Sequence, residues 1–318
     1  MPDPRKLMPW AAMAATLFWA WPVRAWFNGG HMLVAYIAYQ NLTPQIRARV
    51  DALLKLNDTY GEWTAGVDKR QMGLAAFVKA ATWADCIKDK KCKPGYQDLG
   101  GNVPPGQPSD AQNIGYQDKL MHKYWHFIDE PYPDGPGRQP KSPNARTEIK
   151  LLTQAISSTA SDDIKSYDVV WLEHLVGDVH QPLHTTSRFT QNHQSGDEGG
   201  NLVAFCEKPC RDELHAYWDG LLGENPSLAE IRHAGDALMQ AGKPQGADEA
   251  SPDAWIEEGF HLAQSAVYVP PISDDNDPSV TISPRPDESY RIKAAEVARS
   301  QAALAGYRLA ALLNHNLK

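Results

Sequence analysis

The chain has 318 residues, of which 42% are hydrophobic, and its formal net charge is −8. This composition provides enough apolar surface for a folded core, which excludes a disordered protein. No apolar run approaches the ~20 residues needed to cross a bilayer, and the acidic charge excludes a protein that holds duplex DNA through a large basic surface.

The N-terminal segment is predicted to be a secretory signal peptide. A short positive start precedes the apolar stretch Trp10–Trp21, which is too short to span a membrane, and small residues ending at Ala25 precede a cleavage site. A buried N-terminal helix is the alternative. We therefore expect residues 1–25 to be removed, residues 26–318 to form the mature domain with Trp26 at its start, and the protein to be exported without a membrane anchor.

Most of the remaining chain is predicted to be helical, because apolar residues recur at spacings of three and four. The segments with this pattern are Leu33–Leu54 (interrupted near Pro44), Met72–Ala81, Ile149–Ile156, Val169–Val179, Leu214–Leu222, Leu228–Met239, Trp255–Val267 and Ile292–Leu313. Long polar loops rich in Pro, Gly and Asp separate them at Lys93–Asp118, Pro131–Asn144, Thr185–Gly200 and Pro270–Glu288. Apart from a short hairpin around Leu202–Phe205, no strand pattern is evident. The sequence predicts an all-α fold, a single compact helical domain with long loops.

Four cysteines follow the proposed signal peptide, which suggests two disulfides in an oxidising compartment. Short loops favour the pairs Cys86–Cys92 and Cys206–Cys210. A zinc site made of all four cysteines is the alternative, although their spacings are not the tight ones usual in zinc knuckles.

Two pairs of histidine and aspartate at helical spacing indicate a metal site. His174 and Asp178 are four residues apart and share one helix face, and His184 follows on the turn after Pro182. The motif HAYWD contains a second such pair, His215 and Asp219. Imidazoles and carboxylates are donors that zinc prefers, and helices hold them rigidly.

Further donors lie in short motifs elsewhere in the chain. Asp85 ends the motif WAD, His126 begins HFID, and the motif WFNGGH holds Trp26 and His31. The sequence resembles zinc-dependent, single-strand-specific nucleases, which also act as 3′-nucleotidases and are distantly related to zinc-dependent phospholipase C. The resemblance covers nearly all of residues 26–318 and follows the motif order WxxxxH, WAD, HFID, HxxGDxxQPLH, GGN and HxxxWD. The last motif is one residue shorter in this sequence, where it reads HAYWD.

The resemblance implies an all-α fold with three zinc ions at the bottom of a cleft. The first zinc would bind Asp85, His126, His174 and Asp178. The second would bind His184, His215 and Asp219. The third would bind the α-amino nitrogen and carbonyl oxygen of Trp26, with His31 and the bridging Asp178, so that only cleavage after Ala25 releases the required amine.

The same resemblance implies roles for four residues beside the metals. Lys88 and Asp129 would form a charged pair next to the reacting phosphate, Phe127 would stack on a base, and Asn201 would hydrogen-bond the base edge. A stacking slot admits only an unstacked base, which explains a preference for single strands. The expected substrates are single-stranded DNA, RNA and 3′-mononucleotides, the products carry 5′-phosphates, and no obligate protein partner is expected.

Two other functions are compatible with the ligand pattern. Phospholipase C activity is the nearer alternative, although that branch places its first histidine further from the N-terminal Trp than the step from Trp26 to His31. A non-catalytic exported zinc-binding protein would keep the ligands but would not need Lys88, Asp129 and an adjacent aromatic residue. A serine hydrolase of the GxSxG type is excluded, since the motif is absent.

Overall fold

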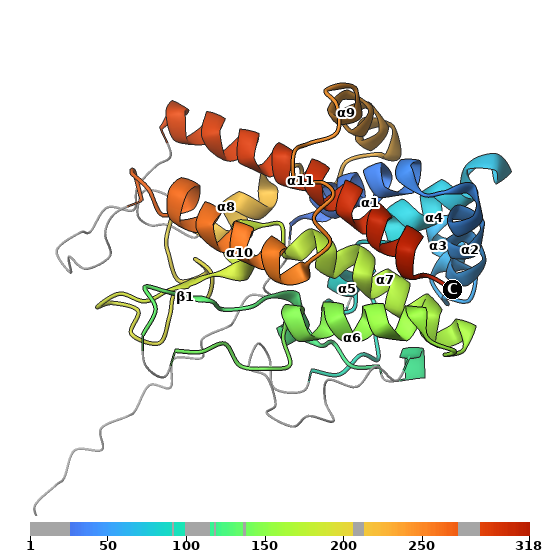
Figure 1. Cartoon of the computed structure of the whole chain (residues 1–318), viewed down its shortest axis with the longest axis horizontal. Coiled ribbons are helices and arrows are strands. Elements are labelled where there is room, and N and C mark those ends of the chain that lie inside the picture. The colour runs from blue at the N-terminus through green and yellow to red at the C-terminus, as the bar shows by residue number, and fades with distance from the viewer. Residues whose placement is uncertain are drawn as a thin grey trace, which may run out of the picture.

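A computed structural model describes residues 26–90, 92–98, 115–117, 119–135, 138–205, 213–272 and 287–318. Within these ranges the regular secondary structure is almost entirely helical (Figure 1). The predicted all-α fold class is therefore confirmed. The proposed signal peptide at residues 1–25 and the pair Cys206 and Cys210 lie outside the described residues. Across the described ranges, no helix has both the length and the apolar character required to cross a membrane.

Helices of very different length make up the described structure. The α-helices are α1 (Asn28–Asn41), α2 (Pro44–Leu54), α3 (Tyr60–Trp63), α4 (Met72–Ala80), α5 (Trp83–Cys86), α6 (Ala145–Ser157), α7 (Asp162–Asp178), α8 (Leu214–Gly220), α9 (Leu228–Gln240), α10 (Pro252–Leu262) and α11 (Glu288–Asn316). Short helical turns are η1 (Lys69–Gln71), η3 (Gly115–Gln117), η4 (Lys123–His126), η5 (Pro182–Thr185) and η6 (Ala263–Val267). The strands are β1 (Pro131–Tyr132) and β2 (Ser187–Arg188).

Two helices form the centre of the molecule. Every residue of α1 from Gly29 to Tyr39 is buried, and so is every residue of α7 from Lys165 to Asp178. A helix that is buried on all sides belongs to a core rather than to a surface. α1 packs against α4, α7, α9 and α11, and Figure 1 shows α11 crossing α1 while α6 lies beside α7. The donors that α1 and α7 carry are therefore held by the most rigid part of the fold.

The structure extends α7 well beyond the predicted segment. The helix begins at Asp162 and not at Val169, because its first turns contain polar residues that hide the apolar period. Lys165 and Asp168 in these turns are nevertheless buried. The predicted segment Trp255–Val267 is divided between α10 and the wider turn η6.

The β structure lies partly where loops were predicted. β1 and β2 form a parallel two-stranded ladder that pairs Pro131 with Ser187 and Tyr132 with Arg188. This ladder was not predicted, since two residues are too few to show an alternating pattern. The expected hairpin around Leu202–Phe205 is represented by a single antiparallel bridge between Ala204 and Glu213.

A disulfide closes the segment that follows α5. Cys86 is bonded to Cys92, which confirms the first predicted pair. The bond joins the last residue of α5 to a point six residues later, and Lys88 lies inside the closed loop. The second predicted pair stays a prediction.

Candidate metal centre

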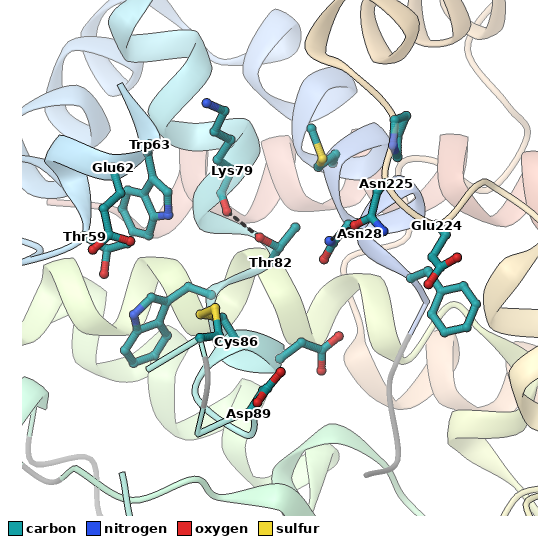
Figure 2. A pocket seen from close by; sticks show the side chains of 16 residues that line it. Asn28, Thr59, Glu62, Trp63, Lys79, Thr82, Cys86, Asp89, Glu224 and Asn225 are labelled. Atoms are coloured by element: carbon teal, nitrogen blue, oxygen red, sulfur yellow. Dashed lines mark hydrogen bonds between the residues drawn. A yellow bond between two sulfur atoms is a disulfide. The ribbon is translucent and has the colours of Figure 1, made fainter. Parts of the chain in front are cut away.

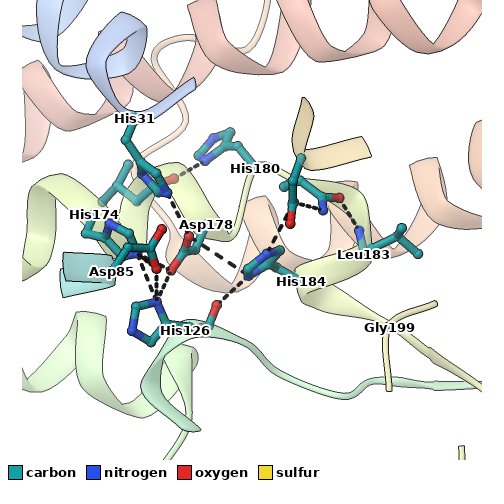
Figure 3. A network of polar contacts seen from close by, with 12 residues as sticks. His31, Asp85, His126, His174, Asp178, His180, Leu183, His184 and Gly199 are labelled. Atoms are coloured by element: carbon teal, nitrogen blue, oxygen red, sulfur yellow. Dashed lines mark hydrogen bonds and ion pairs between the residues drawn. The ribbon is translucent and has the colours of Figure 1, made fainter. Parts of the chain in front are cut away.

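Eight side chains that can bind metal converge on the inner ends of several helices (Figure 3). They are His31 from α1, Asp85 from α5, His126 from η4, His174 and Asp178 from α7, His184 from η5, and His215 and Asp219 from α8. Three groups have donor atoms close enough to share an ion: His31, Asp85 and His174; His126, His174 and Asp178; His184, His215 and Asp219. Donors that are far apart in the sequence thus form one connected set.

Asp178 lies between two sets of histidines, as the dashed lines of Figure 3 show. Its Oδ1 is 3.4 Å from His31 Nε2, whereas its Oδ2 is 3.0 Å from His126 Nδ1 and 3.2 Å from His174 Nε2. The rings of His31 and His174 are stacked with centroids 3.8 Å apart. One carboxylate therefore presents a different oxygen to each side, which is the geometry that bridging two ions requires.

Backbone carbonyls fix the orientation of three histidines. The Nδ1 of His174 is 2.7 Å from the oxygen of Ala81, and His184 and His215 make equivalent contacts of 2.7 Å. Because a carbonyl oxygen only accepts, each Nδ1 must carry the proton, which leaves the Nε2 lone pair for a metal. Within the described chain, the buried Nε2 atoms of His184 and His215 have no hydrogen-bond partner.

Within the part of the chain that the structure describes, His31 and His126 also have ring nitrogens that no hydrogen bond satisfies. Neither ring nitrogen of His31 has a hydrogen-bond partner among the described residues, and the same holds for Nε2 of His126. Buried polar atoms without partners are uncommon and call for an explanation such as an unobserved ion. Together with the all-imidazole and carboxylate donor set, these atoms fit bound zinc.

The second metal group has a supporting residue that the sequence analysis did not single out. The Nε2 of Gln181 donates to Asp219 Oδ1 over 2.8 Å, and its Oε1 accepts from the backbone of Leu183 over 2.7 Å. Hydrogen bonds of this kind orient a metal-binding carboxylate. Its role could have been suspected from the sequence, because Gln181 is the glutamine of the motif HxxGDxxQPLH.

Two glycines permit the close approaches on which the centre depends. A Cβ on Gly177 would lie 2.8 Å from His31 Nδ1, so only glycine lets α1 and α7 meet at this point. Gly199 has a φ of +62°, and its Cβ would lie 2.4 Å from the backbone oxygen of Leu183. The carbonyl of Gly199 accepts the Nδ1–H of His215. Gly177 thus leaves room for the ring of His31, and Gly199 orients the ring of His215.

Burial keeps the histidines neutral. It lowers the pKa of His31 to about 3 and that of His174 to about 4, so both imidazoles are unprotonated and able to bind a metal at neutral pH. Burial raises the pKa of Asp178 and of Asp219 to about 7, although neighbouring histidines oppose the rise. Carboxylates in this environment require positive charge nearby to stay ionised.

Lys88 supplies part of that charge. Its Nζ lies 2.5 Å from Asp85 Oδ1, and both side chains are largely buried. Burial alone would raise the pKa of Asp85, but Lys88 and the histidines reverse the effect and lower it below its usual value. The structure therefore places Lys88 at the edge of the centre, in contact with a predicted metal ligand.

The other predicted substrate residues lie on neighbouring loops. Phe127, directly after His126, is partly buried against the core. Burial, together with the negative charge of Asp197 and Glu198, raises the pKa of Asp129 to about 7. Asn201 follows the glycine turn, where its Nδ2 donates to the backbone oxygen of Glu198 over 2.6 Å. The predicted charged pair between Lys88 and Asp129 stays a prediction.

The start of the described chain lies against the second metal group. Trp26 is fully buried, and the backbone nitrogen of Phe27 donates to the backbone oxygen of Asp219 over 3.1 Å. From there α1 leads directly to His31. This path holds the residue proposed as the mature N-terminus in the neighbourhood of the centre.

Comparison with known proteins gives consistent matches. A family model described as S1/P1 nuclease matches residues 26–318. The chain is 26% identical to Endonuclease 4 of Arabidopsis thaliana over 173 residues, which are 50% of this chain and 54% of that protein. It is 27% identical to Endonuclease 5 of the same plant over 178 residues, covering 50% and 55% of the two chains. The chain thus spans a little more than half the length of these curated relatives.

Proposed function

The chain belongs to the S1/P1 nuclease family, and from this premise we propose that it is a zinc-dependent nuclease. Its substrates are single-stranded DNA and RNA, which it cleaves internally to products that carry 5′-phosphates, and it also removes phosphate from 3′-mononucleotides. The observation that carries the proposal is the bridging geometry of Asp178, whose two oxygens face different histidines.

We assign the predicted ligands to three zinc ions, two of which share Asp178. Asp85, His126, His174 and Asp178 hold the first, and His184, His215 and Asp219 hold the second. The α-amino nitrogen and carbonyl oxygen of Trp26, with His31 and Asp178, hold the third. Zinc bound at these places supplies a nucleophile at neutral pH and positive charge for the phosphoryl and leaving oxygens.

The chain's own residues orient the substrate. Phe127 stacks on the base of the nucleoside whose 3′-oxygen leaves, and Asn201 hydrogen-bonds the edge of that base. Lys88 adds positive charge beside the phosphate. Asp129, three residues after the proposed ligand His126, would orient the attacking water or Lys88. A duplex offers no unstacked base to Phe127, so single strands are preferred.

Processing is part of the proposal. Removal of residues 1–25 exposes the α-amine of Trp26, completes the third zinc site and releases the protein from the cell or into the periplasm. Residues 26–318 then form the nuclease domain. The uncleaved chain lacks the amine and is expected to bind two ions rather than three.

The test uses purified protein that begins at Trp26. We expect it to degrade single-stranded DNA and RNA, to act slowly on duplex DNA, and to release phosphate from 3′-AMP. EDTA should stop all these reactions and added zinc should restore them. Hydrolysis of phosphatidylcholine with nucleic acid untouched would instead indicate a phospholipase, and zinc binding without any hydrolysis would indicate a non-catalytic zinc protein.

A further inference from the structure

A cavity of about 460 Å³ adjoins the metal centre and shares Asp85 with it (Figure 2). It lies between the start of α1, the α3 and α5 helices, and the turn between α8 and α9. Neither Phe127 nor Asp129 nor Asn201 is among its lining residues. The cavity is therefore distinct from the place beside Phe127 that is proposed for the base of the leaving nucleoside. Both lie next to the proposed metal sites.

The cavity combines apolar walls with polar edges. Phe27, Met32 and Trp63 contribute apolar side chains, while the Nδ2 of Asn28 donates to Asn225 Oδ1 over 2.7 Å. Figure 2 shows Trp63 at one end of the cavity and Asn225 towards the other. A volume within the usual range for small-molecule sites, aromatic walls and amide groups together suit a flat heterocycle with a hydrogen-bonding edge.

Charge limits what the cavity can hold. The carboxylates of Glu62, Asp89 and Glu224 line it. Lys79 also lines it, and its backbone oxygen accepts from Thr82 over 2.9 Å. Lys93 pairs with Glu62 over 3.1 Å and Lys88 pairs with the lining residue Asp85. The carboxylates still outnumber the lysines, so a second phosphate would be repelled and the cavity favours an uncharged group over another part of the phosphate backbone.

We propose that this cavity binds the nucleoside on the other side of the cleaved bond, the one that keeps the 5′-phosphate. The inference rests on the proposed nuclease function. A phosphodiester at the metals carries two nucleosides, and Phe127 accounts for only the one that leaves through its 3′-oxygen. The other is joined to the same phosphorus through O5′ and must occupy a space next to the centre, and the cavity is next to it because Asp85 belongs to both.

The reaction keeps this nucleoside in place. Water adds across the bond between phosphorus and O3′, so that phosphorus gains the hydroxide oxygen and O3′ takes a proton. The bond to O5′ is not broken. The cavity therefore holds part of the substrate before cleavage and part of the 5′-phosphorylated product after it.

The test compares two substrates that differ only in this nucleoside. The dinucleoside monophosphate ApA has a group for the cavity, whereas 3′-AMP has none. Asn225 lies on the turn between α8 and α9, so Asn225→Phe fills the cavity and Asn225→Ala removes a hydrogen-bonding group with little risk to folding. The matched control is Gln240→Ala at the exposed end of α9.

We expect Asn225→Phe to raise the KM for ApA about tenfold or more while the kinetics on 3′-AMP stay within about twofold. Asn225→Ala should raise the same KM by a smaller factor, and Gln240→Ala should change neither substrate. An equal loss on both substrates, or no change on either, would overturn the inference. A wild-type protein that hydrolyses neither substrate would instead refute the proposed function.

Discussion

At the scale of single residues, the chemistry depends on how each donor is fixed. His174, His184 and His215 each donate the Nδ1 proton to a backbone oxygen, so Nε2 is the ring nitrogen that can bind a metal. Asp178 differs because both of its oxygens face histidines. If Asp178 bridges two ions as proposed, replacing it should affect both ions, whereas replacing one histidine should affect only one.

Asp178→Asn should therefore be among the most damaging single changes. The amide has one oxygen in place of two and no negative charge, so it cannot bridge two ions. We expect nuclease activity to fall by at least about 100-fold and bound zinc to fall to about one ion per chain. Elemental analysis and an assay on single-stranded DNA measure both effects.

The control for this variant is Asp248→Asn, which alters an exposed carboxylate that forms an ion pair with exposed Lys243. It should leave zinc content and activity unchanged. Near wild-type activity in Asp178→Asn would remove Asp178 from the centre.

Gln181→Ala tests the support of a ligand rather than a ligand itself. Loss of the hydrogen bond to Asp219 should weaken zinc binding in the second group about 10- to 100-fold. Competition with a chelator of known affinity measures the change, and Gln240→Ala on the exposed end of α9 is the control. Unchanged zinc affinity with lowered thermal stability would assign Gln181 a purely structural role.

At the scale of elements, the centre is held by helices of unequal strength. α1 and α7 are buried on all sides, whereas α5 has only four residues and cannot be stable alone. The disulfide from Cys86 and the packing of Trp83 against Tyr96, Tyr167 and Trp171 hold α5 in place. A four-residue helix that carries a predicted ligand is thus held by a covalent bond as well as by packing.

α6, which packs on α7, provides a stability test with a definite sign. Glu148 on α6 is fully buried, and burial raises its pKa from 4.5 to about 8. The folded protein keeps this proton up to about pH 8, whereas the unfolded chain loses it near pH 4.5. The contribution of Glu148 to the free energy of unfolding is therefore fully present below pH 4.5 and decreases as the pH rises towards 8.

Glu148→Gln removes this dependence because the amide cannot ionise. The variant should exceed the wild type in free energy of unfolding at pH 8, by on the order of 3 kcal/mol, and the difference should shrink towards pH 4.5. Urea unfolding at several pH values measures it, with Glu296→Gln on the exposed face of α11 as the control. A difference that does not vary with pH would contradict the assignment.

At the scale of the whole molecule, the acidic charge of −8 is compatible with a polyanionic substrate only if positive charge is concentrated locally. Asp85, Asp178 and Asp219 count towards the acidity, yet all three lie in the centre as proposed ligands. Three divalent ions there would place positive charge at one point of an otherwise acidic protein. Tight association with duplex DNA along the surface is still not expected.

Removing the metals should therefore affect stability as well as activity. Each site occupied at a free zinc concentration about 1,000-fold above its dissociation constant stabilises the fold by about 4 kcal/mol. We expect EDTA to lower the melting temperature by roughly 8 °C or more and added zinc, but not magnesium, to restore it. A melting temperature that EDTA does not change would show that the fold is independent of metal.

The sequence by itself was enough to predict the fold class and the first disulfide, and it singled out the histidines and aspartates that the structure brings together. Residues such as His174 and Asp178 lie on one helix, so the local period of 3.6 residues was enough to pair them. The motif resemblance added donors that are distant in the chain.

Only the tertiary structure decided how those donors meet. No local pattern shows that Asp178 divides its oxygens between α1 and η4, that Gln181 supports Asp219, or that Asp85 also lines a cavity. The buried polar start of α7 was missed for the same reason, since polar residues there are buried by neighbouring helices. Periodicity reports which face of a helix is apolar, whereas contacts between helices depend on packing across the whole chain.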